Sequence, residues 1–134
     1  MKKYIVSPAS VILACAFLLV GCVSVSPEEI ASADFGPKPG DYEERVKKFM
    51  GSVLKDPMSA VYEFRPTLRK GVVMGGLPNN FAKHYGWVVI VSINARNSFG
   101  GYTGAKTYYI MLVPDGRAAD ITDRIQGGFA TLVD

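Results

Sequence analysis

Residues 87–113 read WVVIVSINARNSFGGYTGAKTYYIMLV, and this stretch decides the fold. Residues 87–94 carry apolar side chains at odd and even positions, so an extended strand here is apolar on both faces. Such a strand is typical of the centre of a sheet. Residues 107–113 are mostly β-branched, aromatic or aliphatic and predict its neighbour. The segment between them, with glycines at 100, 101 and 104, predicts a long hairpin connection.

The same connection is one glycine short of a phosphate-binding loop, G-x-x-x-x-G-K-[ST]. Gly100 is followed by four residues and then by Ala105, Lys106 and Thr107. A phosphate loop needs a helix after it, so that the helix N-terminus faces the phosphates. A strand is predicted here instead, and Ala105 stands where the second glycine belongs. We therefore expect no nucleotide binding.

The connection is nevertheless a candidate binding loop, because loops held on rigid strands collect binding groups. Its polar, aromatic and basic side chains are Arg96, Asn97, Ser98, Phe99, Tyr102, Thr103 and Lys106. The alternative is purely structural. In that case Asn94, Asn97 and Ser98 satisfy the turn's own backbone, and Phe99 and Tyr102 fold back as a lid on the sheet.

Upstream, residues 41–55 predict an amphipathic helix. Apolar residues recur at spacings of three and four and form one stripe, comprising Tyr42, Val46, Phe49, Met50, Val53 and Leu54. Asp41 and Glu44 match a capping box. The helix is expected to end at Asp56-Pro57, because the residue before proline is disfavoured in the helical region.

The remaining patterns predict three shorter strands, over residues 59–65, 72–74 and 117–121, while residues 127–134 have no clear assignment. Glycine- and proline-rich turns at 75–80 and 114–116 separate them. One helix followed by consecutive hairpins predicts an α+β fold, in which the N-terminal amphipathic helix packs on an antiparallel sheet of about four strands. We expect residues 41–134 to form a single domain.

The N-terminus has the pattern of a signal peptide. Lys2 and Lys3 precede a ten-residue apolar run, 11–20, which is too short for a membrane core that needs about 20 apolar residues. Leu19-Val20-Gly21-Cys22 resembles the lipobox of bacterial lipoproteins, although a chance Gly-Cys after an ordinary signal is the alternative. The resemblance implies removal of residues 1–21 and acylation of Cys22. Val23 in the next position resembles the class sorted to the outer membrane, facing the periplasm.

Processing changes the charge balance. Lys2 and Lys3 leave with the signal, so the 15 basic residues fall to 13, against 12 acidic ones. This balance gives no electrostatic reason to expect nucleic-acid binding. Residues 22–40 carry three prolines and small polar residues, and we expect a lipidated N-terminus and flexible tether there, with Phe35 pinning its end to the domain.

Three segments together resemble a known family. They are GPKP-x-DY (36–42), KDP-x-SA-x-Y-x-F (55–64) and INARNSFGGYTG (93–104). They are similar to a family of small bacterial lipoproteins and secreted proteins that has no established activity and often carries lysine at the position of Arg96. The resemblance spans most of residues 36–113. It implies one intact domain and contributes no catalytic residue.

Candidate catalytic and metal groups are sparse. His84 is the only histidine, and Cys15 leaves with the signal peptide. Asp115, Asp120 and Asp123 lie near a turn, but their spacing matches no calcium loop. We expect no cofactor and no resident metal.

The expected function is therefore a lipid-anchored, non-enzymatic binding or accessory protein of the cell envelope, of the periplasmic inhibitor, immunity or envelope-machine type. Its partner would be an envelope protein or the cell wall. The alternatives are a small hydrolase using His84 and a purely structural envelope lipoprotein.

Overall fold

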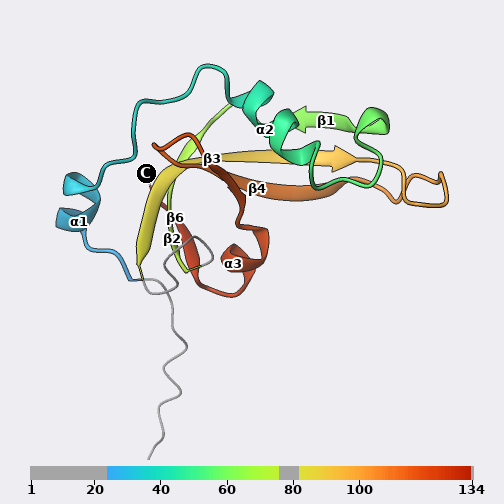
Figure 1. The fold of residues 1–134 in the computed structure, drawn as a ribbon. Helices are drawn as coiled ribbons and strands as arrows, with labels where there is room; N and C mark the ends of the chain where they lie inside the picture. Colours follow the sequence, from blue (N-terminus) through green and yellow to red (C-terminus); the bar gives the residue numbers. More distant parts are fainter. Residues whose placement is uncertain (1–23, 76–81, 134) are drawn as a thin grey trace, which may run out of the picture.

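The computed structural model describes residues 24–75 and 82–133, so the predicted signal peptide and Cys22 lie outside the described residues. The fold is α+β, as predicted, and Figure 1 shows its arrangement. The strands are β1 (Val61–Phe64), β2 (Arg69–Met74), β3 (Lys83–Asn94), β4 (Lys106–Leu112), β5 (Ala118–Asp120) and β6 (Ala130–Val133). The helices are α1 (Pro27–Ser32), α2 (Tyr42–Met50), the 3₁₀ turn η1 (Pro57–Ser59) and α3 (Thr122–Gln126).

All strand pairs are antiparallel, in one six-stranded sheet rather than the expected four. The order is β5-β4-β3-β2-β6, and β1 pairs with the far half of β3. The prediction that residues 87–94 form a central strand is confirmed. Val89 and Val91 belong to one buried cluster and Val88 to another on the opposite face.

β1 and β2 both pair with β3, but a bulge separates them. Phe64 pairs with Val91, and Arg69 pairs with Val88. The four residues 65–68 between β1 and β2 therefore lie opposite only two residues of β3, 89 and 90. Pro66 lies in this bulge, where its missing amide hydrogen removes no ladder bond. The predicted strand at 59–65 begins later than expected, because Pro57–Ser59 form the 3₁₀ turn.

Helix α2 contributes Val46 and Met50 to the cluster that contains Val89 and Val91. It ends at Met50, five residues before the expected end. Gly51 follows, and glycine is a poor helix former. The expected capping box is wrong, because the Asp41 side chain makes no cap hydrogen bond.

Residues 24–40, for which we expected a flexible tether, contain the helix α1 and contact β3 at several points. α1 is capped by Ser26, whose hydroxyl accepts a hydrogen bond from the Glu29 amide. The Lys83 ammonium and the Tyr85 hydroxyl both bind the Glu29 carboxylate. Phe35 is buried in edge-to-face contact with Tyr85, as expected for a pinning residue.

The C-terminal part contains two elements that the sequence patterns left unassigned. α3 follows β5, and Ile125 packs on the second buried cluster. β6 then pairs with β2 and extends the sheet on that side. Among the described residues, no helix is both long and apolar enough to cross a membrane.

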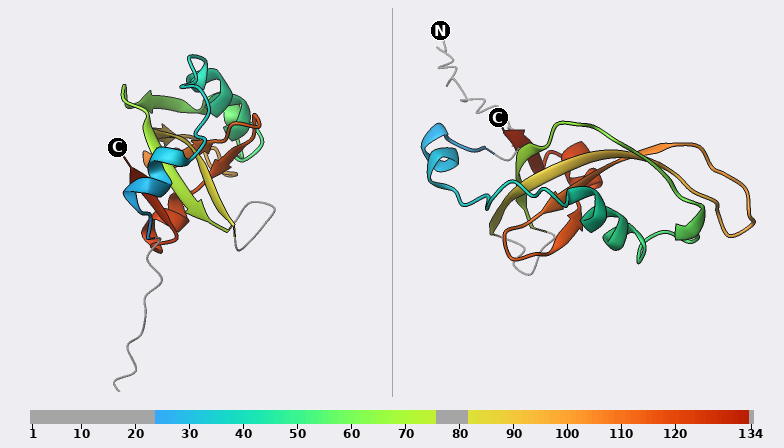
Figure 2. Two further views of the ribbon diagram at one scale, coloured as in Figure 1. Left: turned by 90° about the vertical axis from the view of Figure 1, so that its left-hand side faces the viewer. Right: turned by 90° about the horizontal axis from the view of Figure 1, so that it is seen from above.

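Two ends of the molecule matter for the site. Residues 95–105, called the arm, connect β3 to β4 and project beyond the rest of the sheet, as Figures 1 and 2 both show. α1 lies at the opposite end in both figures. The first described residue, Ser24, is next to α1 and accepts a hydrogen bond from Lys83.

Candidate functional site

The arm is held in one shape by its own hydrogen bonds. The Asn97 side-chain oxygen accepts from the amides of Phe99 at 2.9 Å and Gly101 at 3.1 Å. The Asn97 amide donates to the Gly101 carbonyl at 2.9 Å. Gly100 has φ +81°, a conformation that side chains other than glycine rarely adopt. Asn97 therefore binds backbone groups of its own turn, as expected if the loop has a purely structural role.

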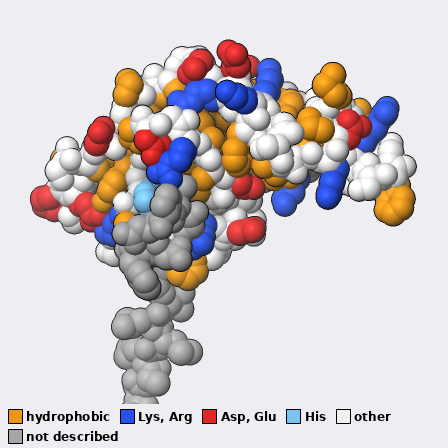
Figure 3. All heavy atoms as spheres, viewed as in Figure 1, with side chains coloured by type: hydrophobic (Ala, Val, Ile, Leu, Met, Phe, Trp, Pro, Cys, Tyr) orange, Lys and Arg blue, Asp and Glu red, His pale blue; other side chains and the backbone are white. Residues whose placement is uncertain are grey.

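Phe99 does not fold back onto the sheet. Its side chain is 96% exposed, and Figure 3 shows a hydrophobic side chain at the outermost point of the arm. An exposed phenyl ring buries almost no surface against the rest of the protein, so its packing adds almost nothing to the stability of the fold. The lid expected under the structural alternative is therefore wrong for Phe99.

Tyr102 ties the base of the arm to the turn before β1. Its hydroxyl donates to the Ser59 carbonyl at 3.2 Å, and the Arg96 amide donates to the Ser59 hydroxyl at 2.9 Å. The Arg96 guanidinium lies 5.2 Å from the centre of the Tyr102 ring, within the range of a cation–π contact. These contacts join two segments about forty residues apart in the chain.

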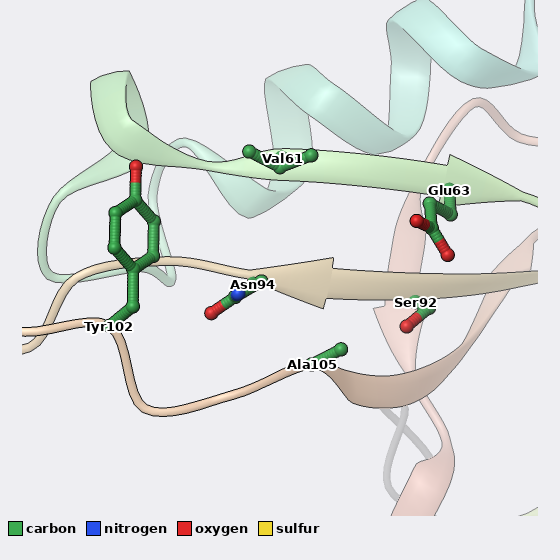
Figure 4. Close-up of a pocket in the computed structure, with 6 residues that line it drawn as sticks. All are labelled: Val61, Glu63, Ser92, Asn94, Tyr102 and Ala105. Carbon is green, nitrogen blue, oxygen red and sulfur yellow. The ribbon is translucent and has the colours of Figure 1, made fainter.

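A hollow of about 210 Å³ lies beside Tyr102, on the sheet face opposite α2. Figure 4 shows that β1, β3 and the arm contribute its walls. The residues that line it are Val61, Glu63, Ser92, Asn94, Tyr102 and Ala105. The Asn94 side-chain oxygen is buried and has no hydrogen-bond partner within the described residues. With the Glu63 carboxylate nearby, the hollow suits a group that donates hydrogen bonds.

Large exposed hydrophobic side chains gather at this end of the protein. Within residues 24–75 and 82–133 there are six of them, and four belong to the arm or to the segment beside it. We call these four the arm-end surface: Met58, Val61, Phe99 and Tyr102. Met58 is 95% exposed. Of the other two, Val53 lines a second hollow and Phe129 precedes β6 at the other end of the sheet.

The predicted loop residues divide between different positions. Arg96, Asn97, Thr103 and Lys106 line the second hollow, which lies on the other side of the arm. Tyr102 lines the first hollow, while Ser98 and Phe99 line neither. Cys22 lies outside the described residues, so its lipidation stays a prediction.

Sequence reasoning missed Met58, Val61 and Glu63. A signal was present for two of them. In the predicted strand at 59–65, Tyr62 and Phe64 face the core, so Val61 and Glu63 had to face the other way. An apolar Val61 on that face was therefore an unexplained exposed residue. Met58 had no comparable pattern, because it lies in a turn.

The groups considered for catalysis or metal binding do not gather at the arm. His84 lies in β3 opposite Val73, at the far end of the strand. The described part of the chain contains no group of three or more His, Cys, Asp or Glu side chains that could hold a metal ion. Asp120 instead accepts hydrogen bonds from the Thr122 amide and hydroxyl at the start of α3. Asp115 binds Arg117, whose hydrogen bond lowers the pKa of that carboxyl.

Comparisons with known proteins add no further information. The chain matches no protein-family model, and no curated protein or solved structure matches it significantly. The interpretation of the site therefore depends on its own geometry.

Proposed function

We propose that this chain is a lipid-anchored protein of the bacterial cell envelope that binds a partner protein through its arm-end surface. The observation that carries the proposal is the exposure of Phe99 and Met58, at 96% and 95%, on one end of the fold. Burying a phenylalanine or methionine side chain contributes about 1.5–3 kcal/mol. Apolar groups gathered at one end are typical of a surface that a partner covers.

The arm's hydrogen bonds favour this role. Binding orders flexible groups, and each immobilised side chain costs about 0.5–1.5 kcal/mol. Asn97 and Tyr102 already fix the backbone that carries Phe99, so less ordering remains for a partner to impose. The phenyl ring is thus presented as a preorganised anchor, which is how aromatic residues contribute most at interfaces.

The chemistry of the surface favours a protein over a glycan strand. The four side chains of the arm-end surface are hydrophobic, and the basic residues Arg96 and Lys106 lie at the base of the arm. A complementary partner would present an apolar pocket with carboxylates at its rim, because opposite charges at an interface rim guide association. The proposal is of the inhibitor, immunity or accessory type and requires no catalytic group.

The proposed anchor is compatible with this contact. The lipid would be attached at Cys22, two residues before Ser24 in the sequence, and α1, next to Ser24, lies at the end of the protein opposite the arm. An anchor there would leave the arm directed away from the membrane, into the periplasm if Val23 specifies the outer membrane. Two or three acyl chains would hold the protein on the membrane, since one alone binds only marginally.

Affinity capture from envelope extracts tests the contact. The lipidated chain should retain an envelope protein that Phe99→Ala loses and Phe129→Ala keeps. Phe129 is the matched control, because it is also a partly exposed phenylalanine but lies at the opposite end of the sheet. Equal capture by both variants would refute the arm-end surface.

Metabolic labelling tests the anchor separately. Cells producing the chain with a clickable fatty acid should label it, and Cys22→Ser should abolish the label and release the protein from the membrane fraction. Equal labelling of the two chains would contradict lipidation at Cys22.

A further inference from the structure

The second hollow has a volume of about 270 Å³ and lies between the end of α2 and the base of the arm. Three cationic side chains line it: Lys55 from the turn after α2, Arg96 from the arm and Lys106 from the start of β4. No carboxylate of the described residues is part of the lining.

The three cations are not neutralised within the described part of the chain. None of them forms an ion pair with a carboxylate of residues 24–75 or 82–133. Arg96 and Lys106 instead lie over aromatic rings, at 5.2 Å from the Tyr102 centroid and 5.0 Å from the Tyr108 centroid. Ring contacts leave the positive charge in place, so the described lining carries three positive charges and no negative one.

The wall of the hollow also contains apolar side chains. Leu54 and the buried Ile93 form part of its wall, and the Thr103 hydroxyl is an additional hydrogen-bond donor. Binding sites for small molecules commonly combine apolar walls with a few convergent polar groups.

We propose that this hollow binds a phosphate group. A phosphate monoester carries a charge of about −1.5 to −2 and three acceptor oxygens, which suit a lining that contains several cationic residues. A carboxylate offers one charge and two oxygens, so it balances less of the positive charge of this lining. The apolar wall leaves room for a nonpolar group attached to the phosphate, so the source is either a free phosphate compound or a lipid headgroup.

The test uses the full chain carrying Cys22→Ser, so that no lipid anchor contributes. Amide signals are followed by NMR while inorganic phosphate replaces chloride at constant ionic strength. We expect saturable shifts at Asn97, Thr103 and Gly104, the polar or backbone groups around the opening. Sodium acetate, titrated in the same way, should bind at least ten-fold more weakly.

Two double variants locate the site. Lys55→Gln with Lys106→Gln should weaken phosphate binding at least ten-fold. Lys38→Gln with Lys48→Gln removes the same charge from exposed positions away from the hollow and should leave it unchanged. Equal weakening by both pairs, or no saturable shift in the parent chain, would overturn the proposal.

A short-chain lipid distinguishes the two sources. Dihexanoyl phosphatidic acid, used below its micelle concentration, should bind at least ten-fold more tightly than inorganic phosphate if the ligand is a lipid headgroup. Equal affinity indicates a free phosphate compound, and in both cases the Lys55 and Lys106 variant must weaken binding. Phe99→Ala should have no effect here, because Phe99 does not line this hollow, so the variant separates phosphate binding from the proposed partner contact.

Discussion

Tyr102 and Ser59 join the arm to the turn before β1 through a hydrogen bond of 3.2 Å between the tyrosine hydroxyl and the serine carbonyl. The same serine accepts from the Arg96 amide, so both strands of the arm's base contact one residue. Without these contacts, the arm would depend only on bonds within itself. The position of Phe99 relative to Met58 therefore depends on this junction.

Replacing Tyr102 with phenylalanine should loosen the arm without unfolding the domain. A single hydrogen bond contributes about 0.5–1.5 kcal/mol, which corresponds to roughly a two- to ten-fold change in local opening. Amide hydrogen exchange at Asn97 and Gly100 should accelerate by this factor, while core strands stay unchanged. Tyr108→Phe is the control, because the Tyr108 hydroxyl makes no hydrogen bond within the described residues. Equal exchange in the two variants would show that the junction does not restrain the arm.

Gly86 is predicted to be a position where no side chain fits. It pairs with Gly71 across β2 and β3, and a Cβ on it would lie 2.5 Å from the Leu112 carbonyl oxygen. Backbone cannot move aside as a flexible side chain can, so Gly86→Ala should lower the free energy of unfolding by about 1–3 kcal/mol. Chemical denaturation measures the change.

Gly40→Ala is the matched control for this substitution. No atom lies within 4 Å of a Cβ built at Gly40, and its φ is not positive. Its effect on the free energy of unfolding should stay within about 0.5 kcal/mol. If the two variants have the same free energy of unfolding, β3 and β4 do not approach each other as closely at Gly86 as the structure shows.

The docking of α1 should depend on pH at both extremes. Hydrogen bonds from Tyr85 and then Lys83 lower the pKa of Glu29 below its ordinary value of 4.5. The stabilisation from ionised Glu29 is therefore complete above about pH 4.5 and is lost as the pH falls through the lower folded pKa. Burial, and then the hydrogen bond to Glu29, raise the pKa of Tyr85 from 10.0 to about 12. The stabilisation that neutral Tyr85 gives to α1 is therefore complete below about pH 10 and is lost as the pH rises through the folded pKa.

NMR signals of residues 27–32 across a pH titration check this dependence. Glu29→Gln should remove the acid transition of α1, whereas Glu28→Gln, an exposed neighbour in the same turn, should preserve it. An acid transition that persists in Glu29→Gln would mean that another group controls α1.

The central hairpin was predictable because its signals are local. Residues 87–94 are apolar on both faces, and this pattern requires cover on two sides wherever the strand lies in the chain. The cover is provided by α2 on one face and α3 on the other. The number of strands was not predictable in the same way. β6 pairs with β2 about sixty residues earlier, and no short pattern in the tail specifies that partner.

Residues 27–32 show the opposite case, in which a local signal was present but was outweighed. Ser26, Pro27 and two glutamates form the N-cap, first position and acidic first turn that favour a helix. Three prolines and small polar residues instead indicated a tether. The deciding contact is the ion pair between Glu29 and Lys83, 54 residues apart, which composition cannot reveal.

The candidate site was predictable in part for the same reason. The loop residues were found because they follow one another in the sequence, and their amide and basic groups were visible there. Met58 and Val61 reach the same surface from a segment about forty residues earlier, through the contact of Ser59 with Tyr102. Only the folded chain brings these two groups together.

Photo-crosslinking in living cells tests the central claim most directly. A photoreactive amino acid at position 99 of the lipidated chain should crosslink to one envelope protein, and one at position 58 should give the same product. At position 129, on the opposite end, that product should be absent. A product of equal yield at 129, or none at 99 or 58 while the chain is membrane-bound, would contradict the account.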